Sequence, residues 1–160
     1  MEKFEILIKE ALQYIKTADH LIYVTFPTVN DNKILMAISE NIYISMVSAM
    51  EALLLYEKEY KRIYNIPENF DLRFELFKST IAKRYSINRE FVFVMGELRK
   101  LLQLHKSSQM EFNRKGSYII CADDFKLKTL NLNKVKQYLN QAKPFIQNID
   151  EIVGRSYKLK

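Results

Sequence analysis

An arginine and a histidine stand six positions apart in the second half of the chain, in Arg99-Lys-Leu-Leu-Gln-Leu-His105. Arginine presents a planar fork of N–H donors that matches the oxygens of a phosphate. Histidine accepts or gives up a proton near neutral pH, which is what moving the proton of a ribose hydroxyl requires. Together the two residues suit phosphodiester chemistry on RNA, and that chemistry needs no metal ion.

The geometry of this pair depends on how its helix ends. On an ideal helix, positions six apart point about 120° away from each other. If the helix frays near its C-terminus, His105 can swing back beside the Arg99 guanidinium. The alternative is a histidine without a catalytic role, because a protonated imidazole at a helix C-terminus suits the negative end of the helix dipole.

Other site chemistries lack their residues. The three glycines, Gly96, Gly116 and Gly154, are isolated, so the chain has no glycine-rich phosphate loop. No Glu-x-x-His pair exists for a di-metal carboxylate site, and two histidines with one cysteine cannot build a conventional zinc site. Cys121 follows Tyr-Ile-Ile and is expected to be a packed structural thiol. We therefore expect no metal and no cofactor.

Composition predicts one soluble domain over residues 1–160. Of the 160 residues, 48% are hydrophobic, enough for a core, and 28% are charged. Uninterrupted apolar stretches are far shorter than the roughly 18 residues of a membrane span, and Glu2, Glu5 and Glu10 are unlike a signal peptide. A single cysteine fits a reducing compartment. We expect a cytoplasmic protein with no membrane contact.

Charge is unevenly distributed along the chain. Up to Glu57 there are four lysines and no arginine against eight carboxylates. The remainder carries twenty-one Lys and Arg against eleven carboxylates, and the whole chain has a net charge of +6. Any polyanionic partner should therefore meet the second half, although a basic solvated surface alone gives the same pattern.

Hydrophobic periodicity predicts long helices, because only three Gly and three Pro interrupt the chain. The first helix should stop before Pro27, and Pro144 should bend the last one. Residues 106–124 include one β-prone piece, Ser117–Cys121, and one strand cannot form a sheet, so we expect an ordered loop. The predicted fold is all-α: an up-and-down bundle of four to five helices with that loop before the last helix. The predicted helices span residues 3–23, 32–64, 72–85, 89–105 and 132–155.

The whole pattern resembles the HEPN (higher eukaryotes and prokaryotes nucleotide-binding) superfamily, over about residues 3–153. Members are all-α bundles whose second helix carries small and aromatic residues, as residues 42–55 do here. Their usual signature is Arg, four to six residues, then His, near the end of a late helix, and Arg99 and His105 match it with five residues between. The segment from Ser108 to Cys121, with Glu111-Phe-Asn-Arg-Lys-Gly, is similar to an archaeal-type branch of the superfamily.

The resemblance implies a homodimer in which Arg and His of both subunits meet at a composite cleft. Active members are metal-independent endoribonucleases. Arg99 would then bind the scissile phosphate, and His105 would be the general acid or base. From charge alone, further contacts to RNA phosphates are expected from Lys106, Ser107, Arg114 and Lys115.

A second function stays open from the sequence. Lys100 follows Arg99 where active members often have an uncharged polar residue, and many members are inactive. The alternative is a non-catalytic helical dimer that binds a protein partner or a nucleotide.

Overall fold

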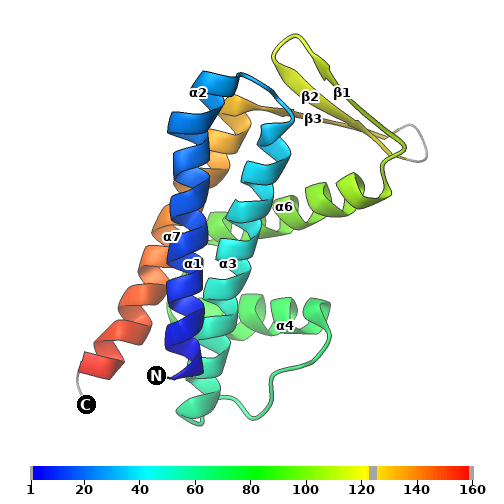
Figure 1. Cartoon of the computed structure of the whole chain (residues 1–160). Helices are drawn as coiled ribbons and strands as arrows, with labels where there is room; N and C mark the ends of the chain where they lie inside the picture. Colours follow the sequence, from blue (N-terminus) through cyan, green and yellow to red (C-terminus); the bar gives the residue numbers. More distant parts are fainter. Residues whose placement is uncertain (1, 123–125, 159–160) are drawn as a thin grey trace.

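The computed structural model describes residues 2–122 and 126–158. Three long helices, α1 (Lys3–His20), α3 (Ile34–Glu59) and α7 (Leu132–Lys158), pack against one another and form the body of the molecule (Figure 1). A helical hairpin leaves this body on the α3 side: α4 (Phe70–Leu76), a π-helical turn η2 (Phe77–Ile81) and α5 (Ala82–Arg84) lead into α6 (Arg89–Ser107). The prediction that helices make up most of the chain is confirmed.

Helix α3 forms the centre of the core, since side chains around most of its circumference are buried. Its serines fit there because Ser39 Oγ donates to Leu35 O at 2.8 Å and Ser45 Oγ donates to Ile42 O at 2.7 Å. By length and composition α3 is the one helix of the described residues that could cross a membrane. However, 61% of its apolar window is buried inside the protein, as in the core helix of a soluble protein.

The first helix does not stop before Pro27, so that prediction was wrong. A π-helical turn, η1 (Leu21–Thr25), continues α1 directly into α2 (Phe26–Val29). The Phe26 N–H donates to Leu21 O, five residues back, and Pro27 falls in the first turn of α2, where a missing N–H is tolerated. Asn30 ends the helix in the left-handed region at φ 52°, with its N–H bonded to Phe26 O at 2.7 Å.

A buried carboxylate holds the arm formed by α4, η2 and α5 (residues 70–84, the α4–α5 arm) to the end of α3. The Glu57 side chain is fully buried. Its Oε1 accepts from Arg84 Nη1 at 2.8 Å, and its Oε2 accepts from Arg62 Nη1 at 3.3 Å. The arm itself begins at Asn69, whose side chain caps α4 by accepting from the Leu72 N–H at 3.2 Å.

The predicted all-α fold is wrong, because residues 106–124 are not a loop packed on a bundle. Three strands, β1 (Met110–Arg114), β2 (Ser117–Cys121) and β3 (Leu127–Asn131), form an antiparallel sheet in the order β1-β2-β3, and the fold is mixed α+β. Lys115 and Gly116 make the two-residue turn between β1 and β2, both at positive φ (43° and 79°). Buried side chains of β2 and β3 anchor the sheet on the helices: Tyr118, Ile120 and Leu130.

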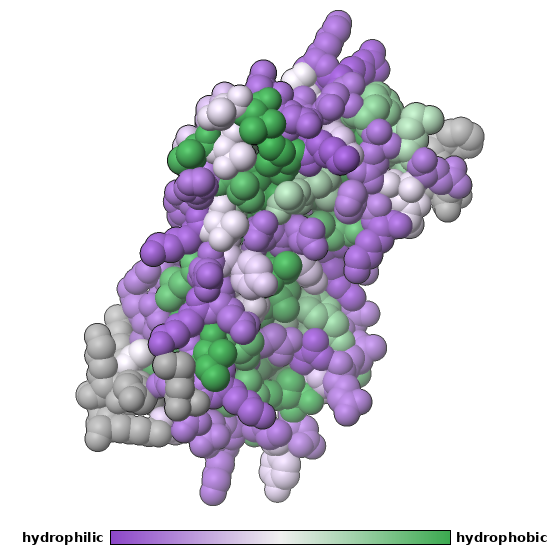
Figure 2. All heavy atoms as spheres, in the orientation of Figure 1, coloured by the Kyte–Doolittle hydropathy of each residue, from purple (hydrophilic) through white to green (hydrophobic). Residues whose placement is uncertain are grey.

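The sheet lies beside the C-terminal end of α6 and leads directly into α7 (Figure 1). Helix α7 continues through Pro144 without interruption. Its apolar stripe, which includes Leu139, Phe145 and Ile149, is buried against α3 and α1. The surface in the view of Figure 2 is mostly polar, and apolar atoms gather over the end of the molecule that holds α2.

Candidate functional site at the C-terminal half of α6

Arg99 and His105 line the same cavity. It measures about 410 Å³ and lies between α3, the start of α4 and α6. On the α6 side, the cavity is lined by the stripe Arg99, Leu102, Gln103 and Lys106, whose i, i+3, i+4, i+7 spacing places them on one helix face. Its lining residues are Glu40, Tyr43, Ile44, Phe70, Arg99, Leu102, Gln103, His105 and Lys106.

Fraying of the helix is not what brings the pair together. Helix α6 remains helical to Ser107, past His105, so the expected swing of the histidine does not occur. Instead His105 stands about 60° beyond Leu102, at the edge of the stripe. The His105 side chain is 42% exposed and the Arg99 side chain is 27% exposed, so both remain accessible from solvent.

Arg99 is held between an aromatic ring and a carboxylate. Its guanidinium carbon lies 4.4 Å from the centroid of the Phe70 ring, and its Nη1 donates to Asp71 Oδ1. Tyr43 borders the same guanidinium. Burial raises the pKa of the Tyr43 phenol, and the positive charge of Arg99 partly offsets that rise. The start of α4 thus fixes the plane of the guanidinium over the cavity, while the exposed Asp71 occupies part of its donor fork.

His105 is paired with Glu111, which β1 folds back beside the helix end. The imidazole Nδ1 lies 2.7 and 2.9 Å from the two Glu111 carboxylate oxygens. A carboxylate only accepts hydrogen bonds, so this contact places a proton on Nδ1. Within the described residues, no protein hydrogen bond engages Nε2 of His105, which leaves that nitrogen for a proton transfer.

Glu111 is in turn held by two hydroxyls. Ser108 Oγ donates to its Oε2, and Tyr118 Oη donates to its Oε1 at 2.7 Å. Burial acts to raise the pKa of Glu111, but the hydrogen bonds from Ser108, Tyr118 and His105 outweigh it, and the pKa is lowered. Burial and the adjacent carboxylate raise the pKa of Tyr118 to about 12. The carboxylate therefore stays ionised, and its direction toward the imidazole is fixed.

The sequence reasoning missed these supporting residues. Glu111 was noted only as part of a segment, and Ser108 and Tyr118 were given no role. The available signal was Arg-Lys-Gly at residues 114–116, since a glycine in a two-residue turn predicts a hairpin. Such a hairpin places Glu111 opposite Ile120 and brings the preceding strand back along the end of α6.

The four predicted RNA-phosphate contacts divide into two groups. Lys106 lines the cavity, and Ser107 adjoins it but donates its hydroxyl to the helix carbonyls of Gln103 and Leu104 at 3.2 and 3.4 Å. Arg114 and Lys115 stand at the turn of the hairpin, about 14 Å along β1 from the strand end beside His105. The structure therefore does not place them at the cavity. Cys121, expected to be a packed thiol, is only half-buried at the end of β2.

Within the described ranges, no three His, Cys, Asp or Glu side chains gather closely enough to hold a metal ion. The elements of the site are thus a guanidinium, an imidazole with its oriented carboxylate, and the lysine Lys106. Comparison with known proteins adds nothing to this description, since no family model, no curated protein and no solved structure matches the chain.

Proposed function

We propose that this protein is a homodimeric, HEPN-like, RNA-directed domain that cleaves RNA without a metal ion, acting in the cytoplasm. The observation that carries the proposal is the shared cavity of Arg99 and His105, in which Glu111 orients the imidazole. A phosphodiester seated there can contact a fork of donors and a proton-transfer group together. The net charge of +10 on the second half of the chain favours a polyanionic substrate.

The chemistry follows from these groups. The ribose 2′-oxygen attacks the adjacent phosphorus, the bond to the 5′-oxygen breaks, and a 2′,3′-cyclic phosphate and a 5′-hydroxyl are formed. Arg99 stabilises the charge on the non-bridging oxygens, and Nε2 of His105 takes the 2′-hydroxyl proton or gives one to the 5′-oxygen. One protomer supplies one such imidazole. In a two-fold dimer, His105 of the second copy supplies the other proton transfer.

Phosphate must compete with Asp71 for Arg99. The Asp71 side chain is 69% exposed, and such a solvent-exposed pair contributes little net stability, about 0–1 kcal/mol. The RNA phosphate can therefore displace Asp71 at small cost. Asp71→Asn should consequently strengthen RNA binding and leave the cleavage products unchanged.

The test is cleavage of a single-stranded RNA oligonucleotide in the presence of EDTA, with products resolved by mass spectrometry. The wild type should yield 2′,3′-cyclic phosphate ends. His105→Ala should lower the rate by a factor of about 100 or more, the usual contribution of a general acid or base. Arg99→Ala should abolish cleavage, and Arg99→Lys should restore little of it, because lysine lacks the fork.

His20→Ala is the matched control, since it removes the chain's other histidine, which is exposed on α1. It should retain wild-type activity. Equal activity in the wild type, His105→Ala and Arg99→Ala would show a contaminating nuclease and contradict the proposal.

The pairing of Arg99 with Asp71 and Phe70 favours a second candidate function. A guanidinium engaged by its own protein also suits a non-catalytic dimer that binds a nucleotide or a protein partner. That function predicts no cleavage by the pure wild type, and a dimer that persists in Arg99→Ala and His105→Ala when its mass is measured by light scattering.

A further inference from the structure

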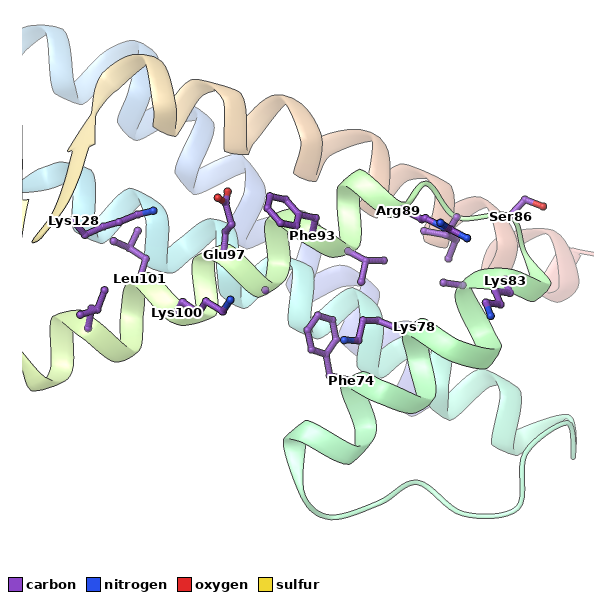
Figure 3. Close-up of a pocket in the computed structure, with 15 residues that line it drawn as sticks. Phe74, Lys78, Lys83, Ser86, Arg89, Phe93, Glu97, Lys100, Leu101 and Lys128 are labelled. Atoms are coloured by element: carbon purple, nitrogen blue, oxygen red, sulfur yellow. The ribbon is translucent and has the colours of Figure 1, made fainter. Parts of the chain in front are cut away.

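A second, larger cavity lies on a different face of α6 and contains neither Arg99 nor His105. It is a groove of about 1010 Å³ between α6 and the α4–α5 arm (Figure 3). One wall is a stripe of α6 that includes Arg89, Phe93, Gly96, Lys100 and Leu104, each three or four positions from the next. This stripe extends about 22 Å, which is four helical turns.

The bottom of the groove is apolar and partly open. The Phe93 side chain is 66% exposed, although it is a large aromatic residue on a helix that packs in the core. Gly96 has no side chain to fill the space beside it, and a Cβ there would meet the Phe74 ring at 3.7 Å, an ordinary contact distance. The glycine is therefore not required for close helix approach. Its effect is to leave the groove deep at its centre.

The rim of the groove is basic. Lys78, Lys83, Arg89, Lys100 and Lys128 border it, and Glu97 is the one carboxylate among the described lining residues. Figure 3 shows these cations distributed along the whole length, from Lys83 and Arg89 at one end to Lys128 at the other.

Most of this positive charge is unmatched. Glu97 is already paired with Lys134 at 3.8 Å, and Lys78 is paired with Glu75 at 3.3 Å. In the part of the chain that the structure describes, Lys83 and Lys100 have no carboxylate partner within 4.0 Å. A basic rim around an apolar floor is complementary to an acidic, amphipathic partner.

We propose that this groove binds an acidic amphipathic helix of a partner protein. The partner helix is about four turns long, and its own apolar face packs on the floor of the groove. Three observations favour a helix over single-stranded RNA. The stripe of α6 along the groove is as long as a four-turn helix, the groove is bounded by α6 and the α4–α5 arm with Lys128 of β3 at one end, and its floor is mostly aliphatic. Base recognition relies on aromatic stacking, and among the described residues that line the groove only Phe74 and Phe93 are aromatic.

The proposal is tested with a fluorescein-labelled 16-residue peptide that carries leucines in an i, i+3, i+4, i+7 stripe and glutamates beside it. Fluorescence anisotropy against the full chain should show saturable one-to-one binding in the micromolar range. The matched control peptide has lysine in place of each glutamate and should bind at least about tenfold more weakly. A scrambled acidic peptide should fail equally.

Substitutions at two exposed positions test whether the peptide binds in this groove. Phe93→Ala removes apolar contact and Lys100→Glu reverses a rim charge, so each should raise the peptide Kd roughly tenfold. Circular dichroism checks that both variants keep the wild-type fold. In a ¹⁵N-labelled protein, the amide resonance of Gly96 should shift on peptide addition.

Arg99→Ala should leave peptide binding unchanged, which separates this inference from the proposed RNA cleavage. The inference is overturned if acidic and basic peptides bind equally, if no peptide binds, or if Phe93→Ala and Lys100→Glu bind as the wild type does. It is also overturned if an oligouridylate, and not the acidic peptide, shifts the Gly96 resonance.

Discussion

Replacing Glu111 by glutamine removes the negative charge next to His105 and keeps the size of the side chain. The Ser108 and Tyr118 hydroxyls can still donate to the amide oxygen, so the main loss is the charged contact to the imidazole. Hydrogen bonds to charged groups contribute about 1.5–3 kcal/mol, and the 42% exposure of His105 reduces that through solvent screening. We expect Glu111→Gln to lower the free energy of unfolding by about 1–2 kcal/mol.

The same substitution should change how stability depends on pH. Because the pKa of Glu111 is lowered in the folded protein, its contribution is complete above the ordinary value of 4.5 and is lost as pH falls through the lowered pKa. The wild type should therefore lose stability as pH falls below about 4.5, and Glu111→Gln should lose less over that acid range.

The assay is urea unfolding followed by circular dichroism at pH 7 and at steps down to pH 3. At pH 7 the expected loss corresponds to a melting temperature about 3–6 °C lower in a chain of this size. Glu10→Gln is the control, because Glu10 is exposed on α1 and, among the described residues, has no ion-pair partner. A Glu111→Gln protein with wild-type stability and an unchanged acid profile would refute the role given to this carboxylate.

Substitutions at three further positions test the packing and the hairpin turn. Glu57→Gln leaves the partly exposed guanidinium groups of Arg62 and Arg84 without a carboxylate partner and should cost about 1–3 kcal/mol in urea unfolding; a loss below about 0.5 kcal/mol would contradict the anchoring of the α4–α5 arm. Tyr138→Phe removes a buried hydroxyl that, within the described residues, has no hydrogen-bond partner, and its melting temperature should equal or exceed that of the wild type. Lys115→Gly relieves a positive φ of 43° in the hairpin turn and should stabilise by about 1 kcal/mol, whereas Lys115→Val should destabilise.

The helices were predictable because their buried residues recur with helical spacing. Arg89–Ser107 was placed to within two residues of its end, since Asn88 is a good cap and Val92, Met95 and Leu98 recur at helical spacing. The predicted helix end before Pro27 was wrong because a single π-helical turn lets the helix continue past this residue, which has no N–H to donate. No local sequence pattern indicates that turn.

The sheet was missed because two of its strands carry little strand pattern. In β1, Met110–Arg114, the apolar Met110 and Phe112 alternate with polar residues over only five positions, and these two side chains are exposed while Glu111 is half-buried. In β3, Leu127–Asn131, only Leu130 is buried. With Ser117–Cys121 as the one β-prone segment, the sequence appeared to contain a strand without a neighbour.

The candidate site was predictable in its two central residues and not in their partners. The type and spacing of Arg99 and His105 suggested phosphate chemistry directly. Asp71 lies 28 positions before Arg99, and Glu111 reaches His105 only because the sheet turns the chain back. Such contacts depend on the path of the chain, which periodicity does not encode.

Helix α6 is a wall shared by the two cavities, with Arg99 on one face and Phe93 and Gly96 on another. A small translation or rotation of α6 displaces the side chains of both cavities together, because they are attached to the same helix backbone. Thermodynamic linkage then sets a strict relation between the two sides. If a ligand in the groove changes the affinity of the Arg99 cavity for an anion by some factor, the anion must change the affinity of the groove by that same factor.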